Sequence, residues 1–172
     1  MTTRFPGMGL LPCLFSGVLV CLLSSCGSSA DPVAGATCDT SQATVATASF
    51  DALWTTVFAP QCGACHGAGT NSGTLGGPDL RTADAFFSGI VGKKGTDYAD
   101  WDTLQKNREG CLDYELIKAG SASQSVVVAV LDSSVSLAGC TIKPHRDAPQ
   151  SVCITASNLT KLKEWIDAGA TR

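Results

Sequence analysis

The feature that most constrains this chain is the pentapeptide Cys62-Gly63-Ala64-Cys65-His66. Two cysteines separated by two residues and followed directly by a histidine have the spacing of a c-type haem attachment site. In such a site both thiols add to the haem vinyl groups and the histidine ligates the iron. Helical spacing would place the two sulfurs and the imidazole around one haem face. The motif therefore predicts one covalent haem c, held by Cys62, Cys65 and His66.

The same pentapeptide would also fit half of a zinc site or a redox-active dithiol. A tetrahedral zinc site needs further cysteine or histidine ligands with matching spacing. The only other histidine is His145, and there is no second Cys-x-x-Cys. A thioredoxin-like dithiol belongs in a βαβ setting, whereas this motif follows an amphipathic helical pattern. Haem attachment is the favoured interpretation of the three.

The first 26 residues predict export from the cytoplasm. Arg4 precedes an apolar run from Leu10 to Leu23 of about 14 residues, which is shorter than the ~20 that a membrane span requires. The run ends in Leu-Ser-Ser-Cys at Cys26, which resembles the lipobox of bacterial lipoproteins. That resemblance implies a signal peptide over 1–25 and a lipid anchor at Cys26. The alternative is a plain signal peptide cut nearby, with Cys26 an ordinary thiol.

Composition limits both the size of the folded part and its partners. The chain has 172 residues, of which 16% are charged, and a net charge of -3. It thus lacks the basic surface that nucleic-acid binding needs. Residues 26–48 are rich in small and polar side chains and predict a flexible tether. Residues 49–172 are then expected to form one domain.

Hydrophobic periodicity predicts a mostly α-helical domain with long loops. One apolar stripe with helical spacing follows a capping Ser49 and stops at Pro60. Its members are Phe50, Leu53, Trp54, Val57 and Phe58. Further helical segments are expected over 83–91, 112–117, 123–131 and 158–168. A strand is the alternative for the valine-rich third segment, and 132–156 is expected to be a long connection.

These elements together resemble the small class I monohaem cytochromes c, including those that occur as lipoprotein domains. The resemblance covers about residues 50–170, through the helix before the motif, the loop Gly77-Pro78-Asp79-Leu80 and the closing Lys-Glu-Trp-Ile-Asp-Ala-Gly-Ala. It implies a cytochrome c-like helical domain around one haem. It also implies that Pro78 and Leu80 line the cofactor, with the Pro78 carbonyl accepting a hydrogen bond from His66. Phe58 and Trp165 would pack where the first and last helices cross.

The sixth iron ligand is where the chain departs from that family, which usually supplies a methionine before the last helix. Both methionines lie within residues 1–25. The corresponding stretch contains Lys143 and His145 instead. His145 is the favoured distal ligand, because neutral imidazole binds iron readily and a lysine must first lose its proton. Lys143 and an open or water-bound position are the alternatives.

The remaining cysteines predict two disulfides. Of nine cysteines, two lie in the signal, Cys26 takes lipid and two take haem. An even remainder in an oxidising compartment favours pairing. The four candidates are Cys38, Cys111, Cys140 and Cys153. The preferred pairs are Cys140 with Cys153 and Cys38 with Cys111, although three connectivities are open and four free thiols are the alternative.

The expected function is electron transfer in the bacterial cell envelope, not enzymatic catalysis. The protein would be lipid-anchored at Cys26, facing the periplasm or on the outer membrane, and would exchange single electrons with redox partner proteins. Two alternatives stay open. One is a haem-based small-ligand sensor or peroxidase-like protein with an open distal site, and the other is a structural lipoprotein subunit of an envelope complex.

Overall fold

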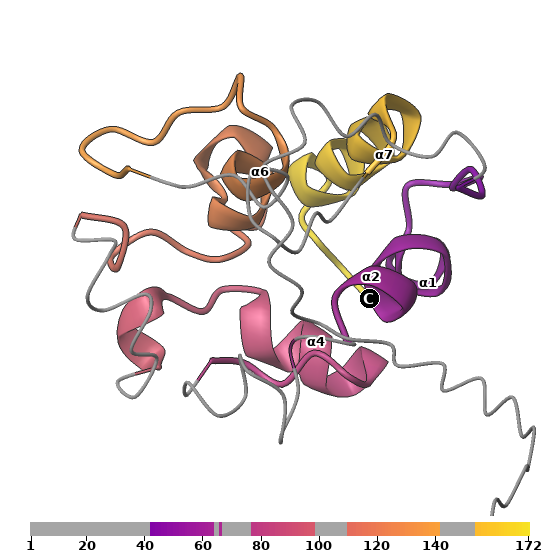
Figure 1. Ribbon diagram of the computed structural model, residues 1–172, viewed down its shortest axis with the longest axis horizontal. Helices are drawn as coiled ribbons and strands as arrows, with labels where there is room; N and C mark the ends of the chain where they lie inside the picture. Colours follow the sequence, from indigo (N-terminus) through magenta and orange to yellow (C-terminus); the bar gives the residue numbers. More distant parts are fainter. Residues whose placement is uncertain (1–41, 64–65, 67–76, 99–109, 142–153) are drawn as a thin grey trace, which may run out of the picture.

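The computed structural model describes residues 42–63, 66, 77–98, 110–141 and 154–172. This part of the chain is mostly helical (Figure 1), and it contains isolated β-bridges but no sheet. Within the same ranges, no helix combines the length and apolar character that crossing a membrane requires. The predicted mostly helical class is therefore confirmed for the described residues.

The first helix has three parts: α1 (Phe50–Leu53), a wide π turn η1 (Trp54–Phe58), and α2 (Ala59–Gln61). The helix ends at Gln61, one residue beyond the predicted stop, so Pro60 lies inside α2. A proline ring in a regular α-helix meets the carbonyl four residues earlier, and a π turn directly before it widens the backbone at that point. The helix thus reaches the cysteine motif without a break.

The second helix, α4 (Ala83–Ile90), begins where the sequence predicts. The Thr82 hydroxyl caps it by accepting the Ala85 amide at 3.2 Å. After α4 the backbone pairs with a distant segment, because the Ile117 amide donates to the Ile90 carbonyl at 2.9 Å and Val91 and Ile117 form a parallel bridge. The predicted helical turn over 112–117 is therefore wrong, since its backbone groups bond across to the end of α4.

A short 3-10 turn, η3 (Ala122–Gln124), precedes α6 (Val126–Leu131). The helical interpretation of the valine-rich segment is confirmed, although α6 begins at Val126 and not at residue 123. Ser125 is fully buried, and its hydroxyl donates to the Ser121 carbonyl at 3.0 Å while accepting the Lys118 amide at 2.9 Å. These two bonds fix the entry to α6.

The closing helix α7 (Ala156–Asp167) agrees with its prediction to within two residues at the start and one at the end. The Thr155 hydroxyl caps it by accepting the Asn158 amide at 3.3 Å, and Gly169 follows the helix with a φ of +105°. Leu162, Trp165 and Ile166 are buried, as the apolar stripe predicts.

The core forms where the first helix lies between α4 and α7 (Figure 1). The Phe50 ring lies 5.8 Å from the Trp165 ring of α7, between centroids, and the Phe58 ring stacks on Phe86 of α4 at 4.2 Å. All four side chains are buried. Phe58 and Trp165 have the packing role that the sequence analysis gave them, with ring centroids 6.3 Å apart.

The segment Gln42–Ala48 differs from the flexible tether expected there, because it is fastened to the start of α7. Asn158 is fully buried, and its side-chain oxygen accepts the Val45 amide at 2.8 Å. Its amide group donates to the Gln42 side chain at 3.0 Å and to the Ala43 carbonyl at 2.9 Å. We call this arrangement of Gln42, Ala43, Val45 and Asn158 the Asn158 clasp. Val45 adds a buried apolar side chain to the core.

Candidate functional site

The cysteine motif begins directly at the end of α2. The Cys62 amide donates to the Phe58 carbonyl at 2.8 Å, and the His66 amide donates to the Cys62 carbonyl at 2.9 Å. Cys62 and His66 are both half-buried, and the ring Nδ1 of His66 is shielded from solvent. This backbone bond from His66 to Cys62 spans four residues, the interval of one helical turn. Cys65 lies outside the described residues.

The loop Gly77-Pro78-Asp79-Leu80 packs directly on the motif. Pro78 and Leu80 are buried, and the Leu80 amide donates to the His66 carbonyl at 2.7 Å. A Cβ at Gly63 would lie 3.1 Å from the Leu80 carbonyl oxygen, so only a glycine leaves room for this approach without a shift. The loop is thus brought to His66 as expected. The hydrogen bond from the His66 ring to the Pro78 carbonyl stays a prediction.

Asp79 in this loop forms an ion pair with Arg81, which directly follows the loop. The Arg81 guanidinium donates to the Asp79 carboxylate, with Nη2 and Oδ2 2.6 Å apart, and the Arg81 amide donates to the same carboxylate at 3.0 Å. The side-chain bond first and the amide bond second lower the pKa of Asp79 to about 2. Both side chains are largely exposed, so the pair fixes the turn more than it stabilises the fold.

Aromatic rings form an apolar wall one helical turn before the motif. Phe58 precedes Cys62 by four residues and contacts both Phe86 and Trp165. Trp54 extends the wall toward the surface, with its ring 5.7 Å from the Phe86 ring. The helical turn before Cys62 is therefore packed into the apolar core.

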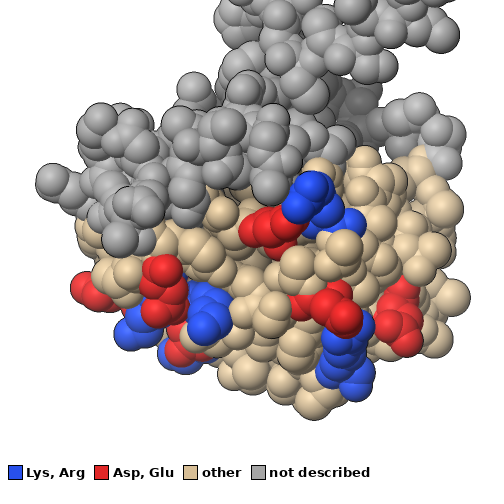
Figure 2. Space-filling view, turned by 90° about the horizontal axis from the view of Figure 1, so that it is seen from below, with Lys and Arg blue, Asp and Glu red and all other residues tan. Residues whose placement is uncertain are grey.

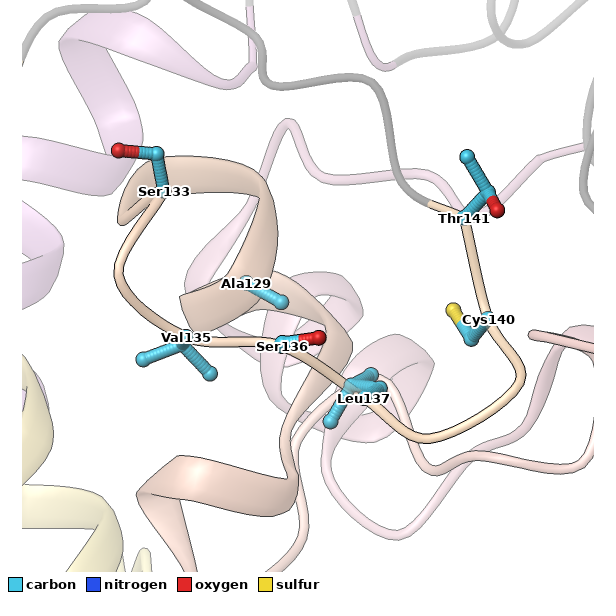
Figure 3. A pocket seen from close by; sticks show the side chains of 7 residues that line it. All are labelled: Ala129, Ser133, Val135, Ser136, Leu137, Cys140 and Thr141. Carbon is cyan, nitrogen blue, oxygen red and sulfur yellow. The ribbon is translucent and has the colours of Figure 1, made fainter.

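A cavity of about 330 Å³ lies at the end of α6 (Figure 3). Ala129, Val135 and Leu137 supply apolar walls, and Cys140 and Thr141 form the side that leads into residues 142–153. The two candidates for the sixth ligand, Lys143 and His145, follow in sequence directly after this wall and lie outside the described residues.

The structure pairs Cys111 with Cys140, with their Cα atoms 4.7 Å apart. Both preferred pairings, Cys140 with Cys153 and Cys38 with Cys111, are therefore wrong. The physical reason is a close backbone approach beside the bond. Gly110 and Gly139 both have positive φ, and a Cβ at Gly110 would lie only 2.0 Å from the Gly139 carbonyl oxygen. Cys38 and Cys153 lie outside the described residues, as does Cys26.

The described donors fit covalent haem attachment. The backbones of Cys62 and His66 are joined by a hydrogen bond, and the loop with buried Leu80 is bonded to the histidine backbone. Within the described ranges no three histidine, cysteine or carboxylate side chains converge on a common metal position. Cys62 and His66 are therefore the donors that this part of the chain offers to a cofactor.

Charges on the described surface are mixed in sign. The face seen in Figure 2 shows basic and acidic side chains interspersed among uncharged ones. Several are paired within the molecule, including Lys163 with Asp132 at 2.6 Å and Lys161 with Glu164 at 2.7 Å. On this face, a partner would therefore meet no large patch of purely positive or purely negative charge.

Sequence reasoning did not single out two residues that shape the site and its surroundings. Gly63 is needed for the close approach of the Leu80 carbonyl. The only feature of the sequence that pointed to it was its position between the two cysteines of the motif. Asn158 holds the Asn158 clasp. Its signal was its spacing from Leu162 and Trp165, which places a polar residue on the inward stripe of α7. Comparisons with protein-family models, curated proteins and solved structures find no match to this chain.

Proposed function

We propose that this protein is a c-type cytochrome that carries single electrons in the bacterial cell envelope. The observation that carries the proposal is the arrangement at the end of the first helix. There the His66 amide donates to the Cys62 carbonyl at 2.9 Å, and the His66 carbonyl accepts the Leu80 amide at 2.7 Å. Covalent haem binding requires a thiol, an iron ligand beside it, and contacts that fix the orientation of that ligand.

In this proposal each residue of the site has a separate task. Cys62 and Cys65 form the thioether bonds, and His66 ligates the iron from the proximal side. Pro78 and Leu80 hold the His66 segment, and Phe58 with its aromatic neighbours keeps water away from it. When bound, the haem supplies a one-electron ferrous/ferric couple. No substrate bond is made or broken, so the protein is proposed as a carrier and not as an enzyme.

The distal side is assigned to the segment that follows the cavity wall. His145 is five residues beyond Cys140, which the disulfide to Cys111 fixes in place. Anchoring this end of the segment lowers the conformational entropy that a ligand loop loses when it binds. We propose His145 as the sixth ligand, with Lys143 second. An iron without methionine ligation should have a lower potential than a His/Met cytochrome.

An exported location is supported by the disulfide, because such bonds persist in oxidising compartments and are rare in the cytosol. Together with the apolar run before Cys26, it favours an envelope protein with a lipid anchor at that cysteine. The domain would then meet redox partner proteins on its exposed faces. The mixed charges of Figure 2 predict that these encounters depend only weakly on salt.

The test is an absorption spectrum of the protein produced with a cytochrome c maturation system. The oxidised form, the reduced form and the reduced form with CO are compared, for the unaltered chain and for His145→Ala. Sharp ferrous bands that CO leaves unmoved, and that become CO-sensitive in His145→Ala, are expected. Bands that shift promptly with CO in the unaltered chain would refute a six-coordinate carrier and favour a ligand sensor. Loss of the haem from the protein on denaturation would refute covalent attachment.

A further inference from the structure

The hydroxyl of Tyr98 ties two segments together near the loop that holds His66. Tyr98 follows η2 (Gly95–Asp97), is half-buried, and donates from its hydroxyl to the Gly89 carbonyl in the last turn of α4. Burial first, and the charge of Asp97 second, raise the pKa of Tyr98 above its ordinary value. The phenol therefore keeps its proton at neutral pH and can donate.

Gly89 brings Tyr98 and Pro78 to the same point on α4. A Cβ at Gly89 would lie 3.4 Å from the Pro78 Cβ and 3.5 Å from the Tyr98 hydroxyl oxygen, and 3.8 Å from the Asp79 carbonyl oxygen. No side chain stands between the helix backbone and the loop at this position. The loop residues Pro78 and Asp79 consequently rest on the part of α4 that Tyr98 holds.

The same loop reaches His66 from its other side. Leu80, two residues after Pro78, donates its amide to the His66 carbonyl at 2.7 Å, and its own carbonyl oxygen faces Gly63. A continuous set of contacts therefore runs from the Tyr98 hydroxyl through Gly89 and Pro78 to the backbone of His66.

We propose that Tyr98 is a positioning residue for His66. Its hydrogen bond holds the last turn of α4 against the loop, and the loop holds the backbone of the iron ligand. The inference rests on the proposed function, because it takes His66 as that ligand. Orientation of a ligating imidazole by groups outside the coordination shell tunes the metal. Release of the Tyr98 bond should therefore change the haem potential as well as the mobility of the loop.

The experiment compares Tyr98→Phe with Tyr114→Phe. Each change removes one hydroxyl that donates to a backbone carbonyl and keeps the ring, and Tyr114 bonds to Ala138, at 2.9 Å, beside the disulfide. Two quantities are measured on the protein produced with the maturation system: the hydrogen-exchange rate of the Leu80 amide and the midpoint potential. Tyr98→Phe should speed Leu80 exchange about fivefold, the factor that corresponds to one ordinary hydrogen bond. It should also shift the potential.

Tyr114→Phe should leave both quantities unchanged. Equal Leu80 exchange rates and equal potentials in the two variants, with haem attached in both, would overturn the positioning role and leave the proposed function standing. An unaltered chain without covalent haem would instead refute the proposed function. The exchange comparison would then still decide whether Tyr98 holds the loop at His66.

Discussion

Replacing Asn158 by alanine should free the segment Gln42–Ala48 and destabilise the domain. Three hydrogen bonds from this one buried side chain disappear, to the Val45 amide, the Gln42 side chain and the Ala43 carbonyl. At ~1 kcal/mol for each bond, the free energy of unfolding should fall by about 3 kcal/mol. The loss exceeds that of an ordinary surface substitution, because the Val45 amide is left buried without its acceptor.

The assay is urea unfolding followed by circular dichroism, with the exposed neighbour Ser157→Ala as the matched control. With a slope of ~2 kcal/mol per molar urea, Asn158→Ala should lower the midpoint by about 1.5 M. Ser157→Ala should change the free energy by less than about 0.5 kcal/mol. Exchange of the Val45 amide should accelerate only in the Asn158 variant. Equal midpoints for the two variants would refute the account of the Asn158 clasp.

Three further outcomes are expected. Gly110→Ala should greatly reduce the yield of the folded, disulfide-bonded protein on a non-reducing gel. Gly120 has a similar positive φ but no atom within 4 Å of an added Cβ, so Gly120→Ala should lower the free energy of unfolding by only about 1–2 kcal/mol. Equal effects of the two substitutions would contradict the close approach. The pKa of Asp132 is lowered to about 2, mainly by the Lys163 side chain, so the stability that its carboxylate contributes is present above pH ~4 and lost as pH falls from about 4 to about 2. Asp132→Asn should therefore make the free energy of unfolding less dependent on pH in that window. An unchanged pH profile would count against the ion pair. Finally, a non-reducing peptide map should link Cys38 to Cys153, because Gln42, four residues after Cys38, accepts the amide of Thr155, two residues after Cys153; two separate thiols there would exclude this pairing.

Much of the helical framework could be predicted from residue spacing. The stripe that begins at Phe50 is buried as expected, except that Trp54 is half-buried. The α4 and α7 segments begin and end near their predicted positions because caps and apolar spacing are local signals.

The remaining features depend on contacts between distant segments. The burial of Phe58 against Phe86 of α4 and Trp165 of α7 joins three segments that are far apart in the sequence, and helical periodicity does not encode which segments meet. The pairing of Cys111 with Cys140 depends on a glycine contact across the fold, and connectivity cannot be deduced from cysteine spacing alone. Composition made the segment around Val45 look like a tether, because its docking relies on one buried asparagine and not on apolar content.

The central claim is that Cys62, Cys65 and His66 bind one haem covalently. The most direct measurement is the intact mass of the denatured protein, produced with a cytochrome c maturation system, beside a Cys62→Ala/Cys65→Ala variant. The account predicts that the unaltered chain keeps the mass of one haem after denaturation and that the variant loses it. An unaltered chain that carries two thiols and no added mass, under conditions in which a control cytochrome c is matured, would contradict it.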